Sequence, residues 1–312
     1  MARRIFVELW EPEYGGSFAG FPQGDLVPSS AEVDPEVEIP ARDWRPLRGA
    51  TGPEVERILF VDGVRRIDAL VYTVDEDGAT RPGLCASWAA GAVLTGARAE
   101  IASAAVARGL FTGVEDVGPL ETEAGVFAPI VVAAETVSQL TSAVQEELRR
   151  LEAKISSGEE SGFDLMVVDG PLSTHHARGP VVGYVKSHHV RYLEPELEAV
   201  VSRLEPGERT PLFLTRTSWK RYSAYLRLEG KKTHPWSGIA RIELPEKSSL
   251  EEARALADAA SAAIPRFSSL PHKDPRAPQN LFPIAGLERE LRRRLGDPAF
   301  VHRALLAAAA RS

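Results

Sequence analysis

The sequence predicts a mixed α/β fold in which helices flank a central sheet. Strand patterns come in a run in the first half of the chain and then alternate with helix patterns, which is typical of mixed α/β domains. The chain has 312 residues, and 44% of them are hydrophobic. This content is sufficient to bury a substantial core, in one large domain or two ordinary ones.

The first fifty residues differ in composition from the rest of the chain. After a short possible strand at 5–9, residues 1–50 are rich in proline, glycine and acidic residues. We expect an irregular N-terminal arm over 1–50 and a single folded domain over 51–312.

Apolar runs with polar boundaries predict the strands of this domain. The predicted strands are 57–62, 66–74, 83–94, 163–168, 180–187, 211–216, 221–228 and 238–244. The pattern does not decide whether 98–109 is helix or strand, and 127–134 is apolar but of ambiguous type.

Helical periodicity is clearest over 136–155. Apolar residues recur there at spacings of three and four, on one face of a helix, at Val137, Leu140, Val144, Leu148, Leu151 and Ile155. A second helix is predicted over 249–264, opened by a capping box between Ser249 and Glu252. Further helices are predicted at 194–205, 282–295 and 298–310.

Charge and cysteine content exclude several classes of protein. The chain has 37 basic and 44 acidic residues and a net charge of −7, so it has no global attraction to nucleic acid or anionic lipid. Cys85 is the single cysteine, which excludes an internal disulfide and fits a reducing compartment. The N-terminus lacks a signal-peptide pattern, and no apolar run reaches the roughly 18 residues of a membrane span. We expect a soluble, cytoplasmic protein.

Two predicted strands run into an Asp-Gly pair. The first is ILFVDG, which places Asp62 before Gly63, and the second is MVVDG, which ends in Asp169 and Gly170. Asp-Gly between two apolar runs is a strong hairpin signal, and this is the simpler interpretation of Asp62. After Asp169 and Gly170 come a proline and a polar stretch, not a returning strand. A carboxylate at the C-terminal end of a buried strand is where α/β folds place their chemistry. Two carboxylates in one crevice repel unless a cation lies between them, and oxygen ligands favour Mg²⁺ or Mn²⁺.

The helix over 136–155 offers a third acid. Glu147 and Glu152 flank its apolar stripe on opposite edges, and the periodicity does not choose between them. Both are also consistent with ordinary solvated helix charges.

The order of several short motifs resembles the NurA family of nucleases. These motifs are ILFVDG, a helix ending in RRLEAKI, FDLMVVDGPL, GYVKS and DPRAPQNLFPIAGLERELRRRLGD, and together they span roughly residues 55–297. The resemblance implies an RNase H-like core with an N-terminal arm and C-terminal helices. It also implies a role in DNA end processing beside a HerA-type hexameric ATPase.

The family's metal-binding acids fall on Asp62, Glu152 and Asp169 of this chain, so the resemblance favours Glu152 over Glu147. A lysine that the family keeps in the following strand falls on Lys186, where it would contact phosphate. Many members carry a histidine near the C-terminus, and none stands at the matching position here. His272 and Asp274 are the candidates to substitute for it.

A basic stretch with aromatic residues could contact DNA. It contains Arg216, Trp219, Lys220, Arg221 and Tyr222. A strand with one packed face explains the same pattern equally well. The basic segment 288–297 is interpreted as a solvated helix face, with Leu287, Leu291 and Leu295 packing inward.

The sequence therefore predicts a DNA nuclease that uses two divalent ions, Mn²⁺ or Mg²⁺, for phosphodiester hydrolysis. By resemblance it is a 5′–3′ exonuclease and single-strand endonuclease, acts in end resection during double-strand break repair with the HerA-type ATPase, and forms a homodimer. One alternative is a catalytically weak or inactive adaptor subunit of that ATPase, which the missing histidine favours. A weaker alternative is a metal-dependent phosphatase of small molecules.

Overall fold

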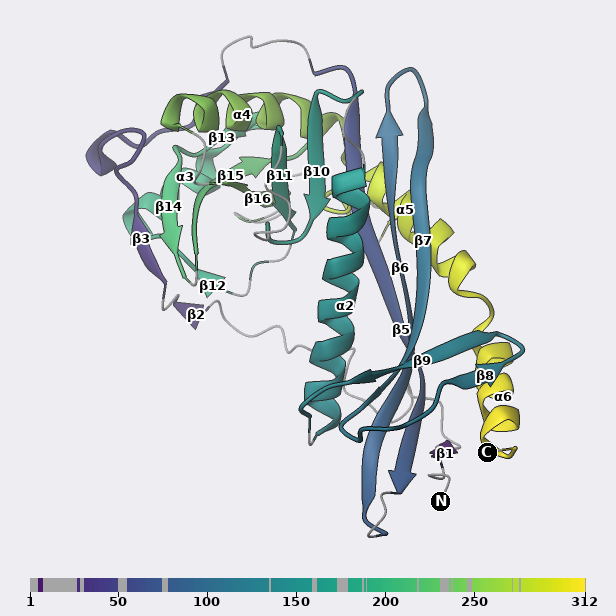
Figure 1. Cartoon of the computed structure of the whole chain (residues 1–312). Helices are drawn as coiled ribbons and strands as arrows, with labels where there is room; N and C mark the ends of the chain where they lie inside the picture. The colour runs from purple at the N-terminus through teal and green to yellow at the C-terminus, as the bar shows by residue number, and fades with distance from the viewer. Residues whose placement is uncertain are drawn as a thin grey trace.

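A large mixed β-sheet with helices on both faces forms the centre of the molecule (Figure 1). The computed structural model describes residues 5–7, 27–28, 31–49, 55–74, 78–134, 136–158, 162–172, 179–186, 188, 190–217, 219–230, 236, 238–245, 249–270, 272–274 and 276–311. Its helices are α2 (Val137–Gly158), α3 (Pro195–Arg203), α4 (Leu250–Ala263), α5 (Phe282–Leu295) and α6 (Pro298–Ala309), with 3-10 turns η2 (Ala41–Asp43) and η4 (Ile264–Phe267). The predicted mixed α/β class is confirmed.

The strands fall into a long antiparallel set and a set of shorter strands. The long strands are β5 (Ile58–Val74), β6 (Thr80–Thr95) and β7 (Ala99–Thr112). The shorter ones are β1 (Ile5–Val7), β2 (Val27–Pro28), β3 (Glu32–Asp34), β4 (Leu47–Arg48), β8 (Leu120–Thr122), β9 (Gly125–Val131), β10 (Leu165–Asp169), β11 (Val181–Val185), β12 (Val190–Arg191), β13 (Glu208–Arg209), β14 (Phe213–Arg216), β15 (Lys220–Arg227) and β16 (Ile239–Pro245).

Parallel pairing occurs at the middle of the sheet and, nearer one edge, between β7 and β9. Across the described residues the strand order is β3-β14-β15-β16-β11-β10-β5-β6-β7-β9-β8. Here β10 runs parallel to both of its neighbours, β5 and β11, whereas β5, β6 and β7 form an antiparallel meander. The segment 98–109, whose type the sequence left open, lies in strand β7 from Ala99 onward.

The predicted break after Asp62 is wrong, because β5 continues through Asp62 and Gly63 to Val74. It pairs with β6 from Ile58 opposite Thr95 to Val74 opposite Thr80, with one irregularity between Ile67 and Ala69. The Asp-Gly pair therefore lies inside a strand and not in a hairpin turn. This continuous ladder outweighs the local turn preference of the two residues.

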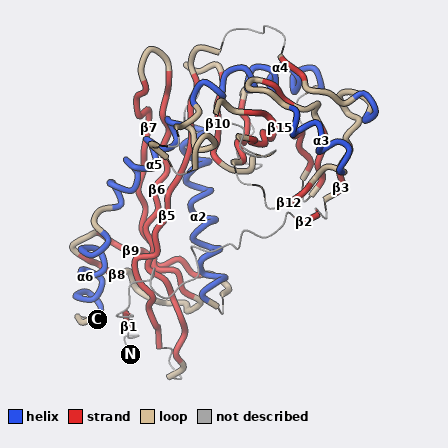
Figure 2. Tube along the Cα trace, turned by 180° about the vertical axis from the view of Figure 1, so that it is seen from behind, coloured by secondary structure: helices blue, strands red, loops and turns tan. Residues whose placement is uncertain are grey.

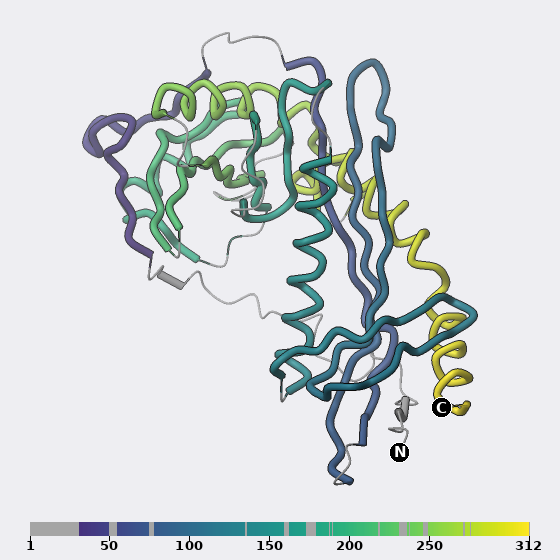
Figure 3. Tube along the Cα trace, viewed as in Figure 1, coloured from purple at the N-terminus to yellow at the C-terminus, as the bar shows by residue number. Residues whose placement is uncertain are grey.

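The described part of the N-terminal segment adds short strands to the sheets. β1 pairs with β5, β3 with β14 and β4 with β13, while β2 pairs with β12 outside the main sheet. In Figure 3 the purple strand β3 lies beside the green strand β14, far from it in sequence. Glu38 ties this segment to the core, because Arg209 donates to both of its carboxylate oxygens at 2.8 Å. Most of the predicted arm, including 8–26, lies outside the described residues.

Helices α2 and α5 cover opposite faces of the long strands (Figure 1 and Figure 2). On one face, Leu140, Val144 and Leu148 of α2 pack with Leu84 and Trp88 of β6. On the other face, Leu287, Leu291 and Leu295 of α5 pack against β5 and β6, as the sequence predicted for these leucines. None of the described helices is long and apolar enough to cross a membrane.

Helix α5 approaches the sheet closely because β6 carries glycine beneath it. A Cβ atom on Gly91 would lie 3.2 Å from both Leu287 and Leu291 and 2.9 Å from the carbonyl oxygen of Ser103. The capping box predicted at the start of α4 is also present, with Ser249 and Glu252 bonded reciprocally.

Two arginines of the long strands bind the C-terminal end of α5. Arg66 donates to the carbonyl oxygens of Gly296 (2.7 Å) and Leu295 (3.3 Å), and Arg108 donates to that of Leu295 (2.9 Å). Cations at this end of a helix satisfy its last carbonyls and complement its dipole. Buried Asp68 orients Arg66 by accepting from its Nε at 2.6 Å, and Ser87 donates to the other Asp68 oxygen at 2.6 Å.

Replacing Asp68 by asparagine should loosen this end of α5. The substitution removes a charge-assisted bond to Arg66, so we expect the free energy of unfolding to fall by about 1–3 kcal/mol in urea denaturation. Glu115→Gln, which neutralises an exposed acid, is the control. Equal stabilities of the two variants would contradict the role assigned to Asp68.

Candidate metal centre

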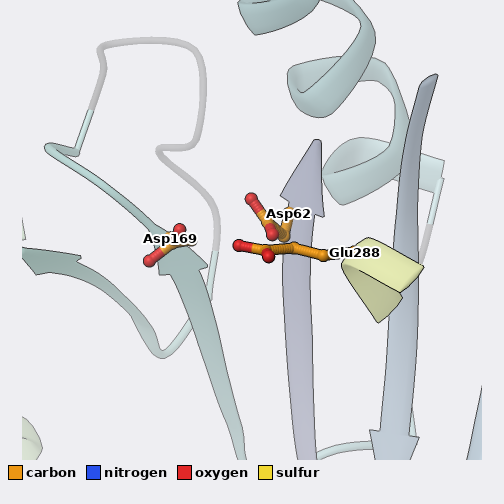
Figure 4. A group of neighbouring side chains, drawn as sticks. All are labelled: Asp62, Asp169 and Glu288. Carbon is orange, nitrogen blue, oxygen red and sulfur yellow. The ribbon is translucent and has the colours of Figure 1, made fainter. Parts of the chain in front are cut away.

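Three carboxylates from separate elements converge at the middle of the sheet. Asp62 on β5, Asp169 at the end of β10 and Glu288 on α5 each offer an oxygen, and these oxygens lie within 4.8 Å of one another. Figure 4 shows the three side chains pointing into one space. We call Asp62, Asp169 and Glu288 the acid cluster.

The sheet register places the two aspartates side by side. Val61 of β5 pairs with Val168 of β10 in a parallel ladder, so Asp62 and Asp169 follow at equivalent positions. Phe60 and Val167 belong to the core on the α4 and α5 side, and side chains alternate along a strand. Both aspartates therefore face the side that α5 covers. Asp62 pairs with Gly91 of β6, the glycine over which α5 lies.

Glu288 was interpreted from the sequence as part of a solvated basic face, and this interpretation is wrong. Glu288 is only 7% exposed, next to the buried Leu287. The sequence does contain a signal for it, because Glu288 follows Ile284 by four residues and precedes Leu291 by three. It thus lies on the apolar face of the helix, where a solvated glutamate is not expected.

A lysine and two arginines partly compensate the charge of the acid cluster. Lys186 Nζ donates to Asp169 Oδ2 at 2.7 Å and to Asn280 Oδ1 at 3.1 Å, and lies 3.7 Å from Glu288 Oε1. Arg276 donates to Glu288 Oε2 at 2.8 Å, and its side chain is half exposed. The exposed Arg292 lies 3.6 Å from the same oxygen. Lys186, which the sequence indicated as a site residue, is thus held beside the acid cluster by its ion pair with Asp169.

Asp274 acts on the cluster through Asn280. The Asn280 side-chain amide donates to Asp274 Oδ2 at 2.6 Å, which turns the amide oxygen toward Lys186. Asn280 is fully buried. Asp274 is therefore a neighbour of the acid cluster and not a member of it. His272 is exposed on the preceding turn and lies outside the cluster.

Burial and mutual repulsion disfavour the charged forms of both aspartates. Burial raises the pKa of Asp62 well above its usual range, with further contributions from the charges of Asp169 and Glu288. Burial also raises the pKa of Asp169, although Lys186 opposes the shift. Asp62 is 5% exposed, and its Oδ2 is buried with no hydrogen-bond partner among the described residues; Asp169 Oδ1 is in the same situation.

This arrangement fits a divalent cation. Unpartnered buried carboxylate oxygens are costly, and a cation between them would remove both the repulsion and the unmet hydrogen-bonding capacity. The donors are all oxygens, as hard ions such as Mg²⁺ and Mn²⁺ prefer.

Glu152 lies beside the cluster on the α2 side. It is 9% exposed, and its Oε1 would be 2.6 Å from a Cβ atom on Gly63, so glycine at 63 leaves it space. Burial, followed by the charge of Asp169, raises the pKa of Glu152 to about 8. Glu147 instead pairs with Arg150 on the helix surface. Of the two acids that the sequence left open, Glu152 is the one near Asp169.

The candidate DNA-binding residues do not form one surface. Trp219 packs against the core on the α2 side, whereas Tyr222 packs against the core on the α4 side. Arg221 lies in a buried ion pair with Glu243 at 3.0 Å, and Arg216 pairs with Glu32 at 2.8 Å. Lys220 is exposed at the start of β15.

Comparison with known proteins identifies the family. A family model described as the NurA domain matches residues 56–292. This match covers most of the chain, so the protein belongs to the NurA family, as the order of its motifs predicted. Among solved structures, the crystal structure of the NurA nuclease from Sulfolobus solfataricus is similar, with a TM-score of 0.47 and 11% sequence identity over 82% of this chain and 86% of that chain. Comparison with curated proteins found no match.

The backbone that follows Asp169 packs directly against Gly183 of β11, where a side chain would not fit. A Cβ atom on Gly183 would lie 2.6 Å from the backbone nitrogen of Leu172 and 3.0 Å from the carbonyl oxygen of Gly170. Gly183→Ala must displace this backbone, so we expect a loss of about 1–3 kcal/mol in urea denaturation. Gly118→Ala, where a Cβ atom would have no neighbour within 4 Å, should change stability by less than about 0.5 kcal/mol. The prediction fails if both variants are as stable as the wild type.

Stability without metal should depend on pH through Glu152. The ordinary pKa of this group is 4.5 and its folded value is about 8, so between these values the folded chain holds a proton that the unfolded chain has lost. The free energy of unfolding attributable to Glu152 therefore falls as the pH rises through this window. In EDTA, Glu152→Gln should show a shallower decline than the wild type, while Glu147→Gln should retain the wild-type decline. If the free energy of unfolding falls with pH equally in the wild type, Glu152→Gln and Glu147→Gln, Glu152 does not bind a proton in the folded state.

Proposed function

We propose that this protein is a divalent-metal-dependent deoxyribonuclease, a phosphodiester hydrolase. The observation that carries the proposal is the pair of buried, unpartnered oxygens on Asp62 and Asp169. A subunit with a purely structural role has no need for them, because burying such groups is unfavourable. Membership of the NurA family supports the same conclusion.

Asp62 and Asp169 would hold the metal, with Glu288 and Glu152 as the adjacent acids. A bound Mg²⁺ or Mn²⁺ would supply Lewis-acid stabilisation of phosphoryl oxygens and lower the pKa of a coordinated water. The strands fix both aspartates at equivalent positions of a parallel ladder, so their carboxylates are preorganised before DNA binds.

Arg276 would contact the phosphate of the substrate, and Lys186 would act on the site through Asp169. The Arg276 side chain is 49% exposed. One terminal nitrogen binds Glu288 and Nε lies 3.9 Å from Asp274, so the other terminal nitrogen is available to a phosphate at the edge of the cluster. Lys186, at 18% exposure, lies deeper and orients Asp169. The Arg276 contact would position the backbone of DNA without reading its sequence.

The finer features of the function are proposed from family membership. They are 5′–3′ exonuclease and single-strand endonuclease activity, action in DNA end resection with a HerA-type ATPase, a homodimeric state, and a cytoplasmic location. An RNase H-like core remains part of the same proposal.

Hydrolysis of end-labelled single-stranded and double-stranded DNA tests the proposal. We expect cleavage with Mn²⁺ or Mg²⁺ and none with EDTA. Asp62→Ala removes a proposed ligand, so the rate should fall by more than the roughly 10- to 100-fold typical of an outer partner of a metal site. Glu147→Ala, an acid of α2 outside the cluster, should retain activity.

Two results would contradict the proposal. Cleavage that persists in Asp62→Ala would place the chemistry elsewhere. Absence of cleavage with either metal, even after addition of the ATPase, would favour the adaptor subunit.

A further inference from the structure

The two oxygens of Asp169 have different surroundings. Oδ2 accepts a hydrogen bond from Lys186 at 2.7 Å, whereas Oδ1 is buried without a partner among the described residues. Asp62 is divided in the same way, because its Oδ1 accepts from the Gly63 backbone at 2.7 Å and its Oδ2 is unpartnered. Each aspartate therefore has one occupied oxygen and one oxygen left for a cation.

The ammonium group of Lys186 occupies a cation position of the cluster. Nζ lies between Asp169 Oδ2 and Glu288 Oε1, at 2.7 and 3.7 Å. Asn280 accepts a further hydrogen bond from Nζ, and Asp274 holds the Asn280 amide in the orientation that this bond requires. Lys186 is thus fixed by a buried network and is not a mobile surface side chain.

The charges of the described residues leave room for one divalent ion. Four acids, Asp62, Asp169, Glu288 and the neighbouring Asp274, face three cations, Lys186, Arg276 and Arg292, so one negative charge is in excess. The charge of a single divalent ion already more than balances this excess. A second ion would create an excess of positive charge in a site with little water to screen it.

We propose that the acid cluster binds one divalent ion per chain, at the free oxygens of Asp62 and Asp169, and that Lys186 serves as a built-in second cation on Asp169. The sequence predicted two divalent ions, and the proposed site holds one. It rests on the proposed metal site but does not require that the protein cleave DNA. Lys186 is a positioning residue in this arrangement, since it acts on the site through Asp169.

Titration of the full chain with Mn²⁺, without DNA, tests the proposal. Calorimetry gives the number of ions bound, and electron paramagnetic resonance distinguishes an isolated Mn²⁺ ion from a spin-coupled pair. We expect one ion and the isolated-ion spectrum for the wild type. Lys186→Met removes the ammonium at similar side-chain length, so it should bind two ions and give a coupled spectrum. Asp62→Asn should lose most of its Mn²⁺ affinity.

Two controls separate charge from packing. Lys186→Arg retains a cation and should bind one ion, and Lys154→Met, which changes an exposed lysine of α2, should also bind one. If Lys186→Met does not fold, Lys186→Gln replaces it in the same titration. The number of Mn²⁺ ions bound by the wild type tests the proposal in either case.

Two ions in the wild type, or one ion in both uncharged Lys186 variants, would overturn the proposal. A failed hydrolysis assay would refute the nuclease but leave these counts unchanged, so the two proposals fail separately.

Discussion

The parallel pairing of β10 with β5 determines where the chemistry of this protein lies. Val168 opposite Val61 brings the next residue of each strand to the same level and the same face of the sheet. A shift of one residue in this register would turn one aspartate to the opposite face and separate the pair. The first part of β5 (58–62), β10 and β11 are packed on both faces, so the register is specified by apolar residues such as Ile58, Phe60, Leu165, Val167 and Val182. The acid cluster thus depends on apolar residues that have no chemical role themselves.

The acid cluster also requires helix α5, which carries Glu288. The long strands hold this helix in place. Leu287, Leu291 and Leu295 hold the helix against the sheet, while Arg66 and Arg108 hold its C-terminal end. Glu288 follows one of these leucines directly, so its place near Asp62 is a consequence of helix docking. The part of β5 beyond Gly63 contributes to the site indirectly, because it carries the residues that anchor α5.

Local patterns predicted much of the fold and part of the site. The aspartates were detectable because each ends an apolar run, and α2 and α4 because their periodicity and capping are strong. The strand β7 was ambiguous because alanine-rich segments have weak preferences, and its pairing with β6 decides its structure. The continuity of β5 could not be predicted, since Asp-Gly prefers a turn and only the β6 ladder overrides it. Glu288 was missed because its basic neighbours on the helix concealed its place on the apolar face. Trp219 and Tyr222 pack on opposite faces of the sheet. Both lie among basic residues and were grouped from the sequence for that reason, without applying the alternation of side chains along a strand.

The two Asp-Gly pairs show how the same dipeptide serves different purposes. Gly63 has no positive φ angle, and its role is to leave space for Leu148 and Glu152 of α2. Gly170 adopts φ of 95°, a conformation that residues with a side chain rarely adopt, and its amide donates to the Tyr184 carbonyl oxygen at 2.8 Å. The first glycine therefore brings a further acid close to the strand, and the second turns the chain away after Asp169. Burial and the neighbouring acids raise the pKa of both aspartates, so their charged forms are disfavoured where they meet. The folded state without a cation bears this repulsion, so an ion bound only by the folded chain would also stabilise the fold around it.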